Sequence, residues 1–137
     1  MTEERDPPRF EHADLRGASF LDVDLSGCQL NDARVDHAKL ENINLFALAL
    51  SDANLAGATL VNVDLSRATL DDANLSGAAL KNIDLSGATL EDANLSGARL
   101  KNVDLRGVVI EDAAIDGLVI DGVRIDELLK TAREKSR

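Results

Sequence analysis

The sequence predicts an all-β protein, a four-sided solenoid in which each coil consists of four five-residue units. An apolar residue returns at every fifth position from Phe10 to Ile125, and all 24 of these positions, here called centre positions, are apolar. A second nonpolar residue, mostly small, lies two positions before each centre and is here called the slot position. Neither an α-helix nor a strand keeps side chains with this spacing on one face, so the chain must turn between centres.

The length of one coil follows from a slower period in the slot positions. Most slots hold Ala, but a β-branched residue returns at every fourth slot: Val23, Ile43, Val63, Ile83, Val103 and Val123. Four units therefore complete one coil, and the repeat region holds about six coils. At about 4.8 Å per coil they would form a rod about 29 Å long.

The corners between the sides are expected to alternate in chemistry. Glycine lies two positions after many centres, at Gly17, Gly27, Gly57, Gly77, Gly87, Gly97, Gly107 and Gly117. The corners between them hold Asp22, Asp32, Asn42, Asp52, Asn62, Asp72, Asn82, Asp92, Asn102 and Asp112. Glycine adopts positive φ without strain, whereas Asp and Asn cap their own turns.

Both ends of the repeat region need protection, because an open solenoid exposes unpaired backbone. Residues 1–7 form an N-terminal tail and residues 8–127 the solenoid, with Pro7 and Pro8 blocking strand pairing at its start. Residues 126–137 hold a short capping helix and a tail, with Asp126 as the N-cap. We expect Leu128, Leu129 and Ala132 to cover the last coil. An end-to-end homodimer through the same residues is the alternative, and a monomer is favoured over it.

One stretch, LFALAL at residues 45–50, departs from the repeat. Leu48 stands in a slot that usually holds Ala, and Phe46 stands in an outward position. Extra methylene groups in a packed core are destabilising, so a local bulge is expected here, with Phe46 partly covering it. This interpretation makes Leu48→Ala neutral or stabilising.

The motifs ADL, ANLSGA, ANLAGA, VDLSRA and IDLSGA resemble the pentapeptide-repeat proteins, whose repeat reads Ala, Asp or Asn, Leu and two variable residues. The resemblance extends over residues 8–127 without a break in register. It implies a right-handed quadrilateral β-helix, with the handedness taken from the family. It also implies a candidate function, because some acidic members mimic duplex DNA and bind DNA gyrase or topoisomerase IV. Those members often have Phe at the centres, where Leu dominates here.

Composition narrows the function classes. No apolar run approaches the roughly 18 residues of a membrane span, so a cytoplasmic protein without membrane contact is expected. Cys28, in a slot, is the single cysteine and is expected to be buried and inert. His12 and His37 lie on different coils, and the recurring serines have no neighbouring base. The sequence predicts no enzyme, no cofactor and no metal site.

Charge is the most informative functional signal. The net charge is −10, and the side with centres Phe10 to Ile110 carries nine acidic residues against one basic residue, Arg9. The acidic residues beyond the first coil on this side form the acidic edge: Asp32, Asp52, Asp71, Asp72, Glu91, Asp92, Glu111 and Asp112. The opposite side uses Asn42, Asn62, Asn82 and Asn102 at its corners and is nearly neutral.

Corner chemistry alone does not require this charge, because Asn serves the opposite corners. We therefore expect the acidic edge to bind a protein partner. We expect no direct binding of nucleic acid, because the acidic edge would repel its phosphates. The predicted function is a non-enzymatic interaction or scaffold module. The alternative is a DNA mimic that binds a type II topoisomerase. The aspartates just before the centres, Asp24, Asp64, Asp84 and Asp104, are interpreted as structural.

Overall fold

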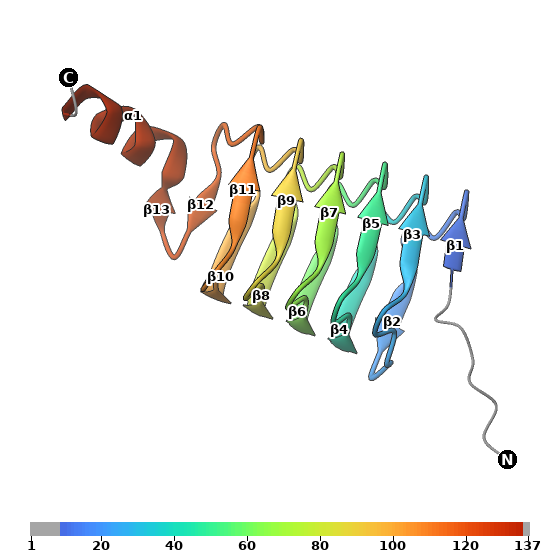
Figure 1. Cartoon of the computed structure of the whole chain (residues 1–137). Helices are drawn as coiled ribbons and strands as arrows, with labels where there is room; N and C mark the ends of the chain where they lie inside the picture. Colours follow the sequence, from blue (N-terminus) through green and yellow to red (C-terminus); the bar gives the residue numbers. More distant parts are fainter. Residues whose placement is uncertain (1–8, 136–137) are drawn as a thin grey trace, which may run out of the picture.

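The protein is a quadrilateral β-helix of about six coils followed by one short helix (Figure 1), as the sequence predicts. The structure, a computed structural model, describes residues 9–135. The predicted tail 1–7, the start of the repeat at Pro8 and the last residues, 136–137, lie outside the described residues. In Figure 1, β1 lies at one end of the rod and α1 at the other.

Two parallel sheets form opposite sides of the rod. The first sheet has six strands, one per coil: β1 (Arg9–Glu11), β3 (Gln29–Asn31), β5 (Ala49–Ser51), β7 (Thr69–Asp71), β9 (Thr89–Glu91) and β11 (Val109–Glu111). The second has seven: β2 (Ser19–Leu21), β4 (Lys39–Asn44), β6 (Thr59–Asp64), β8 (Ala79–Asp84), β10 (Arg99–Asp104), β12 (Val119–Ile120) and β13 (Val123–Arg124).

The register of the sheets shows directly that one coil takes four repeat units. Leu50 lies beside Leu30 in the first sheet, and Leu80 beside Leu60 in the second. One of the two sides between the sheets has no named strand, but isolated parallel bridges such as Asn54 to Asn74 keep the same spacing there. Every position of the repeat is therefore stacked on its own equivalents along the rod.

The corners alternate as predicted, and all of them use positive φ. Glycine corners close a turn in which, for example, the Ala18 N–H donates to the Leu15 carbonyl at 3.1 Å, with Gly17 at φ 69°. That geometry is typical of a type II turn. Asp and Asn occupy the other corners, as at Asp72 (φ 51°) and Asn82 (φ 57°), because they tolerate the left-handed region better than other non-glycine residues do.

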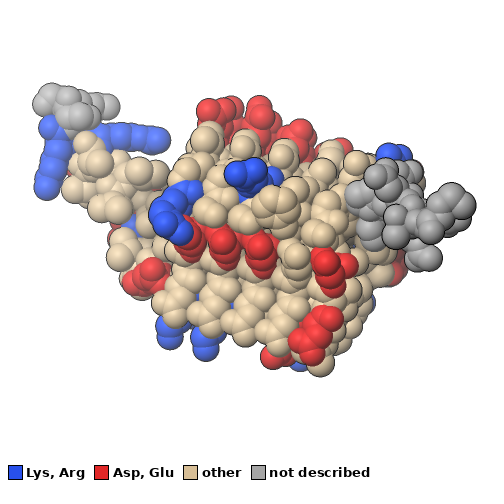
Figure 2. Space-filling model, turned by 60° about the horizontal axis from the view of Figure 1, so that its bottom comes forward, with Lys and Arg blue, Asp and Glu red and all other residues tan. Residues whose placement is uncertain are grey.

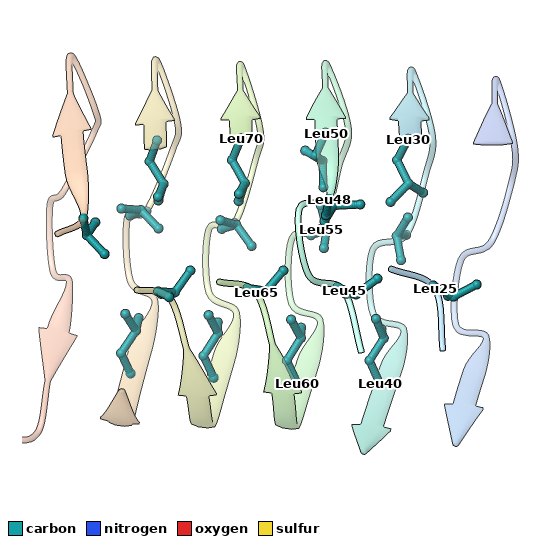
Figure 3. A pocket seen from close by; sticks show the side chains of 18 of the residues that line it. Leu25, Leu30, Leu40, Leu45, Leu48, Leu50, Leu55, Leu60, Leu65 and Leu70 are labelled. Atoms are coloured by element: carbon teal, nitrogen blue, oxygen red, sulfur yellow. The ribbon is translucent and has the colours of Figure 1, made fainter. Parts of the chain in front are cut away.

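The core is the stack of centre and slot residues. Every buried side chain in residues 9–135 occupies one of these two positions, and no polar side chain is buried there. Figure 3 shows the leucines pointing inward from all sides of the coil, where they leave a narrow space of about 60 Å³ along the axis. Cys28 is fully buried as predicted, and burial raises the pKa of its thiol to about 11.

The predicted bulge at Leu48 is wrong. β5 pairs one-to-one with β3 and with β7, and the Thr69 N–H donates to the Leu48 carbonyl at 2.8 Å, as in a regular ladder. Leu48 is 2% exposed and extends into the axial space beside Leu50 and Leu55 (Figure 3). The larger side chain is accommodated because the axis has room that the smaller slot residues leave open.

The C-terminal end departs from the repeat. After β12, the chain turns back and β13 pairs with it in antiparallel orientation, so the sixth coil is not completed. Helix α1 (Ile125–Lys135) follows, and Asp126 accepts hydrogen bonds from the backbone N–H groups of Gly117 and Glu127 at 3.0 Å. The helix buries none of its residues, and only Ile125 packs against the core. No helix in residues 9–135 is long and apolar enough to cross a membrane.

Leu75→Asp tests the inward register. Leu75 is 3% exposed in the middle of the rod, and a carboxylate there would have no partner between the stacked leucines. We expect the variant to lose its cooperative thermal transition, measured by circular dichroism. Ala79→Asp, which places the same group at an exposed position of β8, should still unfold cooperatively. A wild-type melting curve for Leu75→Asp would contradict the register.

Leu48→Ala tests the corrected role of Leu48. Removing a side chain that fills the axial space leaves a cavity, so we expect a loss of about 2 to 4 kcal/mol in the free energy of unfolding. Phe46→Ala, on an exposed side chain of the same coil, should cost less. Both are measured by chemical denaturation. A neutral or stabilising Leu48→Ala would restore the overpacking interpretation.

Candidate protein-interaction site

The acidic edge lies along the first sheet and the corners that follow it. Asp71, Glu91 and Glu111 are the last residues of β7, β9 and β11, so strand pairing places them side by side. Asp72 and Asp92 occupy the next corner positions. Figure 2 shows acidic side chains in rows that run along the rod, with fewer basic ones between them. The fold thus converts the sequence period of four units into a line of carboxylates.

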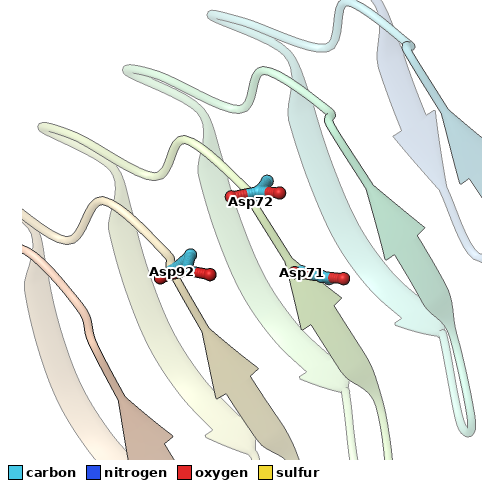
Figure 4. A group of neighbouring side chains, drawn as sticks. All are labelled: Asp71, Asp72 and Asp92. Carbon is cyan, nitrogen blue, oxygen red and sulfur yellow. The ribbon is translucent and has the colours of Figure 1, made fainter.

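The carboxylates approach one another closely. Oxygen atoms of Asp71, Asp72 and Asp92 all lie within 4.8 Å of one another, and the three side chains are exposed (Figure 4). They lie on an open edge, whereas Ca²⁺ takes about six to eight oxygen ligands that converge on it. We therefore interpret the group as part of a charged surface.

The electrostatic effect of this arrangement is visible in two pKa values. The pKa of Asp72 is raised by desolvation and then by Asp71, Asp92 and Asp52. The pKa of Glu91 is raised first by Asp71 and Asp92, with smaller contributions from desolvation and from the next coil. No cation contributes to either shift. At the N-terminal end of the edge, His12 Nδ1 lies 3.6 Å from an Asp32 oxygen.

The equivalent corner of the opposite side is stabilised by hydrogen bonds, whereas the carboxylates of the acidic edge repel one another. The side-chain amide Nδ2 of Asn62 donates to the side-chain oxygen Oδ1 of Asn42 at 3.1 Å. The same bond recurs from Asn82 to Asn62 and from Asn102 to Asn82. An amide carries both a donor and an acceptor, so it can continue such a ladder, whereas an ionised carboxylate only accepts. Aspartate is therefore the less stable choice at a stacked corner.

The aspartates just before the centres are structural, as predicted. The Asp64 and Asp84 carboxylates accept the backbone N–H of Ser66 and Ser86 at 2.8 and 2.9 Å. Asn54, Asn74 and Asn94 make the same turn with an amide oxygen, so charge is not required there. Asp104 also pairs with Arg106, which lowers the pKa of Asp104 to about 2.

The residues predicted to cover the last coil differ in their surroundings. Leu128 is 54% exposed and Ala132 is exposed, whereas Leu129, 38% exposed, lines a surface hollow together with Ile115 of the last coil. Ile110, a centre residue expected to point into the core, is 41% exposed. The exposure of Ile110 could have been predicted from its position in the last coil, because a centre residue is covered only when another coil follows it.

One side-chain contact is not apparent from the repeat pattern of the sequence. The guanidinium of Arg67 lies 6.0 Å from the centroid of the Phe46 ring, within reach of a weak cation–π interaction. Arg67 occupies a corner where most coils have glycine, and its φ of 60° shows that it keeps the same turn. An outward cation that lies one residue beyond the next coil's equivalent of an outward aromatic, as Arg67 does relative to Phe46, is the pattern that reveals such a pair.

The pH dependence of stability tests the electrostatics of the acidic edge. The pKa values of Asp72 and Glu91 lie above their ordinary values of 3.8 and 4.5, so the folded state binds more protons than the unfolded state does in this range. At low salt, we expect the free energy of unfolding to rise as the pH falls from 7 toward 4.5. High salt should reduce the gain by screening the repulsion.

At lower pH, the free energy of unfolding is expected to fall as the pH falls. Asp14 and Asp104 have pKa values of about 2 because of their arginine partners, so their stabilising contribution is present above 3.8 and is lost as the pH falls toward 2. Chemical denaturation at a series of pH values measures both the expected rise in the free energy of unfolding toward pH 4.5 and its expected fall toward pH 2. A stability that only falls from pH 7 downward would mean that the acidic edge carries no repulsion.

The comparisons with known proteins agree with this architecture. The sequence matches the family of pentapeptide repeats, with eight copies, over residues 9–45, 50–87 and 83–117. Among solved structures, the chain is similar to HetL of the cyanobacterium Nostoc sp. strain PCC 7120, a pentapeptide repeat protein involved in regulation of heterocyst differentiation. The identity is 28% over 87% of this chain and 62% of HetL, with a TM-score of 0.43, so the chain spans less than two thirds of HetL.

Two further solved structures are similar to this chain. Rfr23 of the cyanobacterium Cyanothece 51142 is 28% identical over 82% of this chain and 91% of its own, with a TM-score of 0.48. A trypsin-treated form of QnrB1, a plasmid-mediated fluoroquinolone resistance protein, is 14% identical over 93% of both chains, with a TM-score of 0.42. No curated protein matches the sequence. Because the repeats match most of the sequence and the structure has their coil, the chain belongs to the pentapeptide-repeat family.

Proposed function

We propose that the chain is a non-enzymatic interaction module whose acidic edge binds a basic surface of a partner protein. The observation that carries the proposal is the contrast between two stacked corners of one rod. The Asn corner forms a hydrogen-bonded ladder, whereas on the acidic edge neighbouring carboxylates contribute to the raised pKa values of Asp72 and Glu91. A feature that costs stability and that the fold does not require is typical of a functional surface.

Binding of a basic partner follows from the same electrostatics. Lysine or arginine side chains placed along the acidic edge would replace repulsion between carboxylates with attraction. The regular spacing of the charges fixes the register of a partner, and the field of the whole edge would accelerate the encounter at low salt. The affinity should therefore depend strongly on ionic strength.

Several features support a role without catalysis. No polar side chain within residues 9–135 is buried, so no acid or base of that part of the chain is enclosed in a pocket. The Cys28 thiol is enclosed and stays protonated because burial raises its pKa. The hollow near Asp14, Arg16 and His37 is an open surface depression that contains no nucleophile beside a base.

A more specific candidate is mimicry of duplex DNA toward a type II topoisomerase. Three successive coils carry two acidic residues each on this edge: Asp71 and Asp72, Glu91 and Asp92, and Glu111 and Asp112. At about 4.8 Å per coil, this is about one charge per 2.4 Å, compared with about one per 1.7 Å of duplex DNA. Such a rod would occupy the DNA-binding surface of DNA gyrase or topoisomerase IV and either inhibit or protect the enzyme.

Neutralising the acidic edge tests both the general proposal, binding of a basic partner protein, and the specific one, mimicry of duplex DNA. We expect Asp52→Asn, Asp72→Asn and Asp92→Asn, combined in one chain, to abolish binding to a basic partner and to leave the fold intact. Asn already occupies the equivalent corner of the opposite side with the same φ sign, so only charge is removed. The matched control is Asp24→Asn, Asp64→Asn and Asp84→Asn, which removes the same charge from another side and keeps turns that Asn also forms.

Two measurements use these chains. Immobilised wild type and both variants are exposed to purified DNA gyrase and topoisomerase IV at low and high salt, and supercoiling activity is followed with and without quinolone. Loss of binding in the edge variant but not in the control supports DNA mimicry. If neither enzyme binds, a salt-sensitive partner captured from cells by wild type and control but not by the edge variant supports the broader module. Equal binding by all three chains would contradict both.

A further inference from the structure

The two sheets end differently at the C-terminal end of the rod. The second sheet ends in a hairpin, because the chain turns back after β12 and β13 pairs with it in antiparallel orientation. The first sheet ends at β11, which pairs with β9 on one side, and no strand in residues 9–135 pairs with its other side. This free side of β11 is here called the open edge. An unpaired strand edge is a template for a further strand.

Helix α1 does not close the open edge. Its first turn is tied to the corner at Gly117, where Asp126 accepts the backbone N–H at 3.0 Å, and Figure 1 shows the helix continuing from β13. Ile110, the centre residue of β11, is 41% exposed, although the equivalent Leu90 is 3% exposed. The sequence also has no proline after Pro8, so β11 lacks the residue that blocks strand pairing most directly. The open edge thus exposes both backbone and apolar core.

The backbone groups of the open edge are those that hold the next coil elsewhere in the first sheet. The Ala88 carbonyl accepts the Val109 N–H at 3.0 Å, and the Asp92 N–H donates to a β11 carbonyl at 3.1 Å. Their equivalents one coil later are the Val108 carbonyl and the Asp112 N–H, and no further coil follows on this side within residues 9–135. A segment that follows the path of β11 would satisfy both groups.

The side chains of the open edge favour a basic segment. Glu111 stacks on Glu91, and Asp112 occupies the corner that follows. A second copy is a poor occupant, because its β1 in the continued register would place Glu11 beside Glu111, and its β11 would bring further carboxylates. Lysine or arginine in the same place would instead attract the carboxylates. The charge therefore favours a segment of a different protein.

We propose that the open edge binds an extended segment of a partner protein by addition of a parallel strand. The segment has an apolar residue stacked on Ile110, where it covers the end of the core, followed by a basic residue beside Glu111. The N–H of the residue before the apolar one donates to the Val108 carbonyl, and the carbonyl of the basic residue accepts the Asp112 N–H. This site lies at the end of the rod and does not depend on what binds along the acidic edge.

A labelled peptide tests the proposal by fluorescence anisotropy with the full chain. The probe is Gly-Ala-Thr-Leu-Lys-Asn-Ala, blocked at both ends, which places leucine on Ile110 and lysine beside Glu111. Replacing its lysine with glutamate should raise the dissociation constant about fivefold, because an attraction becomes a repulsion. Methylating the threonine nitrogen should raise it at least about tenfold, because the donor to Val108 is lost. Glu111→Lys should reverse the preference between the lysine and glutamate peptides.

Two controls locate the binding. In nuclear magnetic resonance spectra, the lysine peptide should shift the backbone amide of Asp112 and leave that of Asp32, at the other end of the rod, unchanged. The chain with Asp52→Asn, Asp72→Asn and Asp92→Asn keeps the open edge, so it should bind the peptide within about threefold of wild type. Failure of the acidic edge as a partner surface would therefore be distinguishable from failure of the open edge.

Three results would overturn the proposal. The first is no binding at millimolar peptide, and the second is equal binding of the methylated peptide. The third is an assembly of copies, detected by sedimentation, that the peptide dissociates, because the open edge would then belong to a second copy of this chain.

Discussion

Parallel stacking of coils of equal length is the constraint on which the rest of this structure depends. Because Leu30 pairs with Leu50 and Asp71 pairs with Glu91, each position of the repeat lies about 4.8 Å from its own equivalents. Side chains at equivalent positions of successive coils therefore form a ladder along the rod. Leucine ladders bury apolar surface and amide ladders hydrogen-bond, whereas carboxylate ladders repel. The stability of the rod and the character of its surface thus have one origin.

This constraint makes most of the fold predictable from the sequence. The period of five excludes a helix and a simple strand, and the β-branched residue at every fourth slot indicates the coil length, which the pairing of Leu60 with Leu80 confirms. The acidic edge was also predictable, because a fixed coil length assigns each residue to a side. Stacking then brings Asp71, Asp72 and Asp92 together without any long-range folding that the sequence would have to reveal.

The features that were not predictable depend on space and on missing neighbours. Leu48 suggests overpacking if every coil has the same interior, but the axial space accommodates it. Ile110 follows the repeat perfectly and is nevertheless exposed, since its burial depends on a seventh row that the chain does not build in the first sheet. Periodicity describes what a residue contacts within the array and says little about the array's ends, where the helix and the open edge lie.

The central claim is that the acidic edge stores unrelieved repulsion, and the pKa values of its individual carboxyl groups test it most directly. Carboxyl titration followed by nuclear magnetic resonance should place Asp72 and Glu91 above their ordinary values of 3.8 and 4.5, and Asp24 below 3.8. High salt should move the first two back toward those values and leave Asp24 nearly unchanged, because a hydrogen bond is screened less than a repulsion between exposed charges. Values for Asp72 and Glu91 at or below the ordinary ones would show that hydrogen-bond donors or cations stabilise these carboxylates, and would contradict the account.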